Sequence, residues 1–226
     1  MSSIRGMLLI DKPTNATSFK ICNTIKRVLD AKKTGHCGTL DPLATGLLII
    51  LINEAVKKQN EFMKQDKIYS ASFKLGIRTD SADTDGKIIE QKDYSYVNEI
   101  LIKDYLKSFL GEIEQIPPMF SALKVKGQKL CELARKGIEI ERKPRKVNIK
   151  NIEMLSFSNG ILDLKIECSS GTYIRSIADD LGKLLGCGAA VCALRREKSG
   201  IFDVKDAVGE NDFYKPEILK SKIIQL

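Results

Sequence analysis

The chain has 226 residues, of which 43% are hydrophobic and 29% charged, and its formal net charge is +8. This composition is typical of a globular protein and excludes a disordered chain, and the length allows one large domain with a buried core. Every apolar run is shorter than the roughly 18–20 residues that span a membrane, and the N-terminus lacks a secretory signal. We therefore expect a cytoplasmic protein.

Six cysteines lie at positions 22, 37, 131, 168, 187 and 192, without a CxxC pair. A chain of this length does not need disulfides, and the cytosol keeps thiols reduced. His36 is the single histidine, which leaves little basis for a zinc site. We expect free, mostly buried thiols and no metal.

The first half of the chain alternates short strands and helices. Residues 6–11 are typical of a buried strand, and a helix is expected from about Ser18 with Thr17 as its cap. A strand over 47–52, a helix over 55–63 and a strand over 69–75 follow. The helical spacing of apolar residues over 97–109 predicts a further helix, which Gly111 ends.

The clearest strand covers 162–168, where apolar residues alternate with Asp163, Lys165 and Glu167. After a turn at 169–172, an apolar stripe predicts a helix from about Tyr173 to the residue before Gly186. Strands and helices are mixed without a regular βαβ order. This pattern favours an α+β fold, with a mixed, largely antiparallel sheet flanked by helices.

The positive charge is concentrated in one segment. Residues 124–150 hold ten Lys or Arg residues and three Glu, a local balance of +7. A charged run of this kind is either a solvated face or a surface that binds phosphates and gains affinity by counterion release. Composition alone leaves both interpretations open.

Residues 35–46 (GHCGTLDPLATG) place the carboxylate of Asp41 among glycines and beside Pro42. Taken alone, this segment could be a turn that leads into a strand. It resembles the catalytic-aspartate motif of the TruB-type tRNA pseudouridine synthases. With four further strings in the family's order, the resemblance covers residues 6 to about 204.

The resemblance implies a pseudouridine-synthase catalytic domain over 1–204, with an insertion at about 115–146. The tail, 205–226, is too short for the RNA-binding PUA domain of many relatives. Asn15 stands where the family usually has glycine, and asparagine tolerates the left-handed conformation that such a position requires.

The family motif assigns Asp41 the role of nucleophile. Residues 171–175 (GTYIR) resemble the family's G-[ST]-Y-[IV]-R string, which implies that Arg175 keeps Asp41 ionised and that Tyr173 binds substrate. Tyr69, at the start of a strand, would ordinarily be a half-buried packing residue. The resemblance implies that its ring stacks on the target base and that its hydroxyl assists proton transfer.

His36 could be a general base, a metal ligand or a packing residue. The resemblance implies instead that its ring stacks inside the RNA loop, in the place of the extruded base. Leu194, which precedes two arginines, resembles a leucine at the edge of the uracil pocket.

Residues 80–86 superficially suggest a calcium loop. Aligning Gly86 with that loop's glycine puts Ser81 and Lys92 where Asp and Glu are required, which argues against calcium. The segment resembles the family's R-T-D-x-x-D-x-x-G stretch, in which Asp83 would help to hold Arg175. For Asp80 and Asp85, a polar hairpin turn is the alternative interpretation.

Residues 115–124 resemble the segment that leads into the family's RNA-gripping insertion, which continues to 142–146. The insertion coincides with the excess of positive charge. The resemblance therefore implies that these cations contact the tRNA backbone: Lys124, Lys126, Lys129, Arg142, Lys143, Arg145 and Lys146.

The implied reaction is isomerisation of the T-loop uridine at position 55 of tRNA, after that base has been flipped into a pocket. Asp41 would attack the sugar C1′ or help to form a glycal, without cofactor or metal. The expected partner is the tRNA T arm, with no protein partner and a monomeric enzyme. The alternatives are a non-catalytic tRNA-folding chaperone with the same basic surface and, disfavoured by the missing PUA domain, the catalytic subunit of a guide-dependent synthase.

Overall fold

The computed structural model describes residues 4–125 and 127–226; of Lys124 and Lys129 it describes the backbone only. The chain forms two compact units. The first unit consists of residues 1–69 and 194–226, and the second consists of residues 70–193. Strands β4 (Lys67–Leu75) and β12 (Ala189–Ser199) contribute residues to both units.

The first unit contains a sheet in the order β1-β3-β12, in which β2 also pairs with β3, and β13 with β12. Its elements, besides the shared strands, are β1 (Gly6–Lys12), α1 (Ser18–Val28), β2 (Thr34–His36), β3 (Thr45–Ile52), the 3₁₀ helix η1 (Asn53–Lys58), α2 (Gln59–Met63), β13 (Phe202–Asp203), the 3₁₀ helices η2 (Val204–Asp206) and η3 (Glu210–Asp212), and α6 (Pro216–Ser221).

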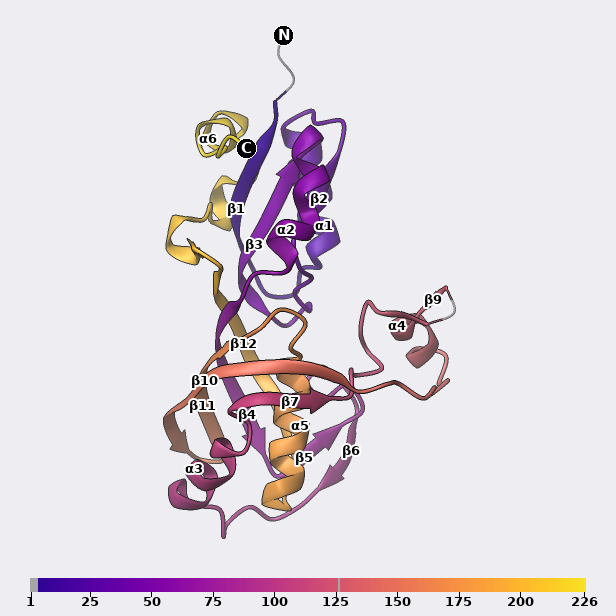
Figure 1. Ribbon diagram of the computed structural model, residues 1–226, viewed down its shortest axis with the longest axis vertical. Helices are drawn as coiled ribbons and strands as arrows, with labels where there is room; N and C mark the ends of the chain where they lie inside the picture. Colours follow the sequence, from indigo (N-terminus) through magenta and orange to yellow (C-terminus); the bar gives the residue numbers. More distant parts are fainter. Residues whose placement is uncertain (1–3, 126) are drawn as a thin grey trace. The chain divides into compact units, whose positions relative to one another are not determined.

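Strand β3 is the centre of this unit, because its residues 47–52 are apolar and completely buried. Helix α1 lies beside β2 and β3 (Figure 1). The predicted cap of α1 is confirmed: the Thr17 side chain accepts a hydrogen bond from the Lys20 amide at 3.1 Å. One cluster of the unit's core consists of Met7, Leu9, Cys37, Leu47, Ile49, Leu51, Ala55, Phe62 and Val204.

The second unit contains a sheet in the order β12-β4-β11-β10-β7 and two small hairpins, β5-β6 and β8-β9. Its elements, besides the shared strands, are β5 (Ile77–Thr79), β6 (Ile88–Gln91), α3 (Glu99–Lys107), β7 (Gly111–Gln115), β8 (Lys124–Val125), β9 (Gln128–Lys129), α4 (Leu130–Ala134), β10 (Arg145–Ser158), β11 (Ile161–Cys168) and α5 (Ile174–Leu185).

Periodicity predicted two elements of this unit well. Strand β11 buries its alternate apolar residues, as expected. Helix α5 buries an apolar stripe and ends at Gly186, which adopts a left-handed conformation with φ of 80°. Helix α3 lies beside α5 (Figure 1). The predicted α+β fold with a mixed sheet is confirmed: β12 pairs in parallel with β3, whereas β1–β3, β10–β11 and β10–β7 are antiparallel.

Two expectations were wrong in detail. The expected helix over 55–63 is divided into η1 and the five-residue helix α2. Strand β10 was not expected, because it buries few of its fourteen residues. Its first residue, Arg145, is in register with Gln115, the last residue of β7. The expected insertion therefore leaves and re-enters the sheet at adjacent positions.

All six cysteines are described, none of them forms a disulfide, as expected, and four of them are buried. In the part of the chain that the structure describes, no helix is both long and apolar enough to cross a membrane.

Candidate active site

Asp41 lies in the first unit, half-buried in the loop between β2 and β3. Ser18, at the start of α1, holds this loop through its hydroxyl. The hydroxyl accepts a hydrogen bond from the Leu40 amide at 2.9 Å and donates one to the Leu40 carbonyl at 3.1 Å. The Ala44 amide donates to the Asp41 carbonyl at 3.1 Å and closes a turn. The backbone is thus fixed on both sides of the carboxylate.

Two buried cations hold the same loop. Lys12 Nζ donates to the Pro42 carbonyl at 3.3 Å. Arg196 Nη2 donates to the Gly38 carbonyl at 3.2 Å, and Arg196 Nε donates to the Leu47 carbonyl at 2.7 Å. The loop is therefore held both before and after Asp41 by side chains from β1 and β12.

Asn15 supports the loop through its backbone. Its amide donates to the Pro42 carbonyl at 2.9 Å, and its φ of 57° confirms the left-handed conformation expected where the family usually has glycine.

Lys12 is an unusual cation, because its side chain is completely buried. Its ammonium also donates to the carbonyls of Pro13 and Ala16 at 2.8 and 2.7 Å. Burial lowers the pKa of Lys12 from 10.5 to about 8, while the charge of Asp41 raises this pKa and that of Arg196 lowers it. Lys12 therefore places a titratable positive charge close to Asp41, which favours the charged form of a carboxylate.

The other predicted residues of the first unit lie on its strands. His36 ends β2, and its Nδ1 is buried without a hydrogen-bond partner among the described residues. Burial and the charge of Arg196 lower the pKa of His36, so its ring is neutral at neutral pH. Tyr69 on β4 and Leu194 on β12 are both buried.

Arg175 lies in the second unit, in the first turn of α5. The N-cap of this helix is Tyr173, the residue predicted to bind substrate. The Arg175 side chain is buried. The guanidinium donates to the Ser81 carbonyl through Nη1 at 3.0 Å and to the Phe120 carbonyl through Nη2 at 2.7 Å. The second contact joins Arg175 to the start of the insertion.

Asp83 forms an ion pair with Arg175, with 3.6 Å between Asp83 Oδ2 and Arg175 Nη1. Its other oxygen, Oδ1, accepts from the Ser81 hydroxyl at 2.6 Å, and its carbonyl accepts from the Thr79 hydroxyl at 2.6 Å. Asp83 is buried and held by its own loop, as a residue that orients an arginine must be.

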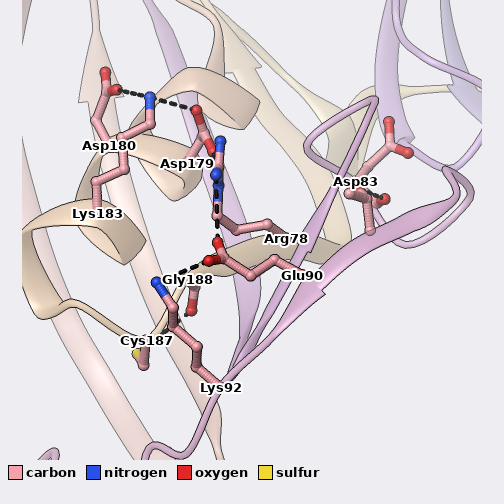
Figure 2. Close-up of polar contacts among 10 residues, drawn as sticks. Arg78, Asp83, Glu90, Lys92, Asp179, Asp180, Lys183, Cys187 and Gly188 are labelled. Atoms are coloured by element: carbon pink, nitrogen blue, oxygen red, sulfur yellow. Dashed lines mark hydrogen bonds and ion pairs between the residues drawn. The ribbon is translucent and has the colours of Figure 1, made fainter.

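An ion-pair network fixes this loop against α5 (Figure 2). Arg78 on β5 pairs with Asp179 of α5 at 3.2 Å and with Glu90 of β6 at 3.3 Å. Lys183 pairs with Asp179 at 2.6 Å, and Lys92 pairs with Glu90 at 2.8 Å. Hairpin β5-β6, which carries the Asp83 loop, is thereby joined to the helix that carries Arg175. Among the described residues, no group of three His, Cys, Asp or Glu side chains is placed to hold a metal.

The predicted phosphate-binding cations have different surroundings. Arg142 pairs with Glu139 at 2.9 Å, and Lys146 pairs with Glu112 at 2.7 Å. Lys143 and Arg145 are exposed, and in the described part of the chain neither has a carboxylate partner. Lys126 lies outside the described residues, as do the side chains of Lys124 and Lys129.

Apart from Asp83, motif matching overlooked the residues that hold the site together. Lys12, Ser18 and Arg196 fix the Asp41 loop, and Gln115 contacts the residue before Arg175's helix begins. A usable signal was present for Lys12, since a lysine on the same strand as the apolar run 7–10 has to be solvated or bonded. Gln115 gave no such signal.

The sequence matches two family models over most of its length. Residues 26–174 match the N-terminal domain of TruB family pseudouridylate synthases, and residues 175–221 match the C-terminal domain of tRNA pseudouridylate synthase B. A tRNA pseudouridine synthase B from Endomicrobium trichonymphae is 55% identical over 100% of this chain and 98% of that protein. The Clostridium tetani protein of the same name is 44% identical over 95% of this chain and 74% of its own.

Solved structures with the same fold include a Cbf5-Nop10-Gar1 complex, with a TM-score of 0.75, 28% identity and 97% of this chain covered. A second is an H/ACA RNP bound to a substrate RNA containing 2′-deoxyuridine, with a TM-score of 0.70 and 26% identity. This chain spans 60% and 58% of those two chains. The family models and the curated relatives agree. The chain belongs to the TruB family of pseudouridylate synthases, enzymes that isomerise uridine in RNA to pseudouridine.

Proposed function

We propose that this protein isomerises the uridine at position 55 in the T loop of tRNA, with Asp41 acting on the ribose. One observation carries the proposal: the Asp41 loop is held at Gly38 by Arg196, at Leu40 by Ser18 and at Pro42 by Lys12. A loop fixed at three points positions a carboxylate for chemistry, whereas a connecting turn does not need such support.

The chemistry begins once the target base is flipped out of its stack. The Asp41 carboxylate then attacks C1′ and the C1′–N1 bond breaks, or it removes the 2′ proton and the sugar becomes a glycal. The freed uracil rotates, and its C5 bonds to C1′ as the ester bond between Asp41 and C1′ breaks or, on the glycal route, as Asp41 returns the proton to C2′. The proton leaves C5 and N1 regains one, so that substrate and product are isomers and no redox partner or group donor takes part.

The other residues have supporting roles in this proposal. The Tyr69 ring stacks on the base and its hydroxyl assists proton transfer, while Leu194 and Tyr173 line the uracil pocket. The neutral ring of His36 is suited to stacking in place of the extruded base. Arg175 acts as a catalytic cation and Asp83 orients it, an arrangement that the 3.6 Å ion pair supports.

We further propose that the enzyme acts as a cytoplasmic monomer on the tRNA T arm, without a guide RNA or protein partner. Some solved neighbours come from assemblies with Nop10 and Gar1, but the proteins at 44–55% identity are named tRNA pseudouridine synthases. The higher identity favours direct action on tRNA.

The test is purified protein mixed with an unmodified tRNA transcript and no other factor, followed by mapping of pseudouridine. We expect pseudouridine at position 55 and none in a transcript with cytidine there. Modification at another position would contradict the proposed specificity. A tRNA that is refolded but not modified would favour the chaperone alternative.

A further inference from the structure

Gln115 is a buried residue at the base of the insertion, in register with Arg145 where the insertion returns to the sheet. Its side-chain amide contacts the backbone of Tyr173 twice. The Tyr173 amide donates to Gln115 Oε1 at 3.0 Å, and Gln115 Nε2 donates to the Tyr173 carbonyl at 3.3 Å. The side chain therefore pairs with Tyr173 as a neighbouring strand would, across 58 positions of sequence.

The next residues of the insertion are held by the same turn of α5. The Ser176 hydroxyl donates to the Ile116 carbonyl at 3.1 Å, and Arg175 Nη2 donates to the Phe120 carbonyl at 2.7 Å. Residues 173, 175 and 176 thus bond to residues 115, 116 and 120. Each bond joins the start of the insertion to the proposed catalytic cation or to a residue within two positions of it.

One side of this segment is open. Residues 116–120 line a partly open pocket of about 720 Å³ together with Ser176, Asp179, Asp180 and Lys183 of α5, whereas Pro117 and Met119 within the segment are buried. On the open side, hydrogen bonds to α5 fix the segment in place of packing contacts. The Gln115 pair is the deepest of these, since the Gln115 side chain is 2% exposed.

We propose that Gln115 is a positioning residue for Arg175, which couples the RNA-gripping insertion to the catalytic cation. The inference rests on the proposed function, because it takes Arg175 as catalytic and the insertion as the RNA-binding element. With the Gln115 amide in place, the Phe120 carbonyl and the Tyr173 backbone are fixed together. The Arg175 guanidinium, which bonds the Phe120 carbonyl and follows Tyr173 in the chain, is then held in one position relative to RNA that the insertion binds.

The amide is specifically required by the chemistry of the contact. Tyr173 offers one donor and one acceptor, so its partner must supply one of each at the same spacing. Glutamate has no donor, methionine has neither group, and asparagine is one methylene shorter. Gln115→Met keeps the length and apolar stem of the side chain and removes both hydrogen bonds.

The test compares Gln115→Met with Val147→Ala, a control in the neighbouring strand β10 whose buried apolar side chain cannot hydrogen-bond to residues 173–176. For each variant, the single-turnover rate at saturating tRNA, the tRNA Kd and the melting temperature are measured. We expect Gln115→Met to slow the saturated rate about tenfold or more, with Kd within about threefold. Val147→Ala should melt earlier but keep its rate within about twofold.

Three outcomes would overturn the inference: a Gln115→Met rate within twofold of wild type, an equal slowing by Val147→Ala, or a loss confined to Kd. Hydrogen exchange separates its failure from that of the proposed function. In Gln115→Met the Tyr173 amide should exchange at least about tenfold faster, with β11 unchanged, whether or not the wild type modifies tRNA. Unchanged protection at Tyr173 would refute the coupling by itself.

Discussion

Removing the exposed cations Lys143 and Arg145 of the insertion should weaken tRNA binding and reduce its dependence on salt concentration. Each cation that neutralises a phosphate contributes roughly 0.7–0.9 to the slope of log affinity against log salt. Lys143 and Arg145 are exposed and without a carboxylate partner among the described residues, whereas Arg142 and Lys146 already pair with Glu139 and Glu112. Of the seven predicted phosphate contacts, four fall at 142–146, and because two of these four cations already pair with glutamates, we expect the other two to contribute most of the salt dependence.

The double variant Lys143→Gln/Arg145→Gln should therefore flatten the slope by about 1.4–1.8. Neutralising Arg142 and Lys146 as well should add little, rather than bring the total to the roughly 3 units expected for four contacts. The single-turnover rate of the saturated complex should not change, because these residues are proposed to bind the tRNA backbone and not to act on the target uridine.

The assay is filter binding of tRNA over a range of salt concentrations. A matched control, Lys103→Gln/Lys107→Gln, removes the same charge from exposed positions on α3. An unchanged slope in the insertion variant would refute the reasoning, and so would an equal change in the control. Either result would indicate that the cations at 142–146 form a solvated face and do not bind phosphates.

Two further substitutions test the residues around each proposed catalytic group. Arg175→Lys keeps the charge but cannot bond the Ser81 and Phe120 carbonyls together. We therefore expect a large fall in the single-turnover rate and a loss of about 1–3 kcal/mol in the free energy of unfolding. Equal rates in the variant and the wild type would refute the catalytic role of Arg175. Lys12→Met tests the buried ammonium of Lys12. The pKa of Lys12 is about 8 in the folded chain and 10.5 in the unfolded chain. Between these two pH values the unfolded chain therefore binds more protons than the folded chain. The stabilisation of wild type over Lys12→Met in denaturant titrations should therefore rise with pH across that window, by at most roughly 3 kcal/mol, and a constant difference would contradict the buried, shifted ammonium.

Short sequence patterns predicted the elements in which one face is buried and the other is exposed to solvent. The alternation of β11, the Thr17 cap and the left-handed Gly186 all follow from short stretches of sequence. Strand β10 could not be predicted this way, because most of its residues are exposed or half-buried and its pairing with β7 and β11 sets its conformation. The helix expected over 55–63 was also wrong because a long-range contact acts at its start. Asn53, the first residue of η1, has a φ of 54°, and its side chain donates to the Ile4 carbonyl. No side chain caps η1 or α2.

Motifs identified the groups proposed to react and one residue, Asp83, that pairs with Arg175, but not the other residues that hold these groups. Asp41 and Arg175 were found from short strings in a known order. The burial of Lys12 and the contact of Gln115 with Tyr173 join segments that are distant in sequence, and a lysine or glutamine in isolation looks like a surface residue. Such long-range partners become visible only in the folded chain.

The most direct test of the central claim is the single-turnover rate of Asp41→Asn on an unmodified tRNA transcript, with Asp30→Asn as an exposed control in the same unit. Asparagine keeps the shape of the side chain and removes its charge. If Asp41 acts on the ribose, Asp41→Asn will form no detectable pseudouridine while its tRNA Kd stays within about threefold of wild type, and Asp30→Asn will react at the wild-type rate. A rate for Asp41→Asn within tenfold of wild type would contradict the account.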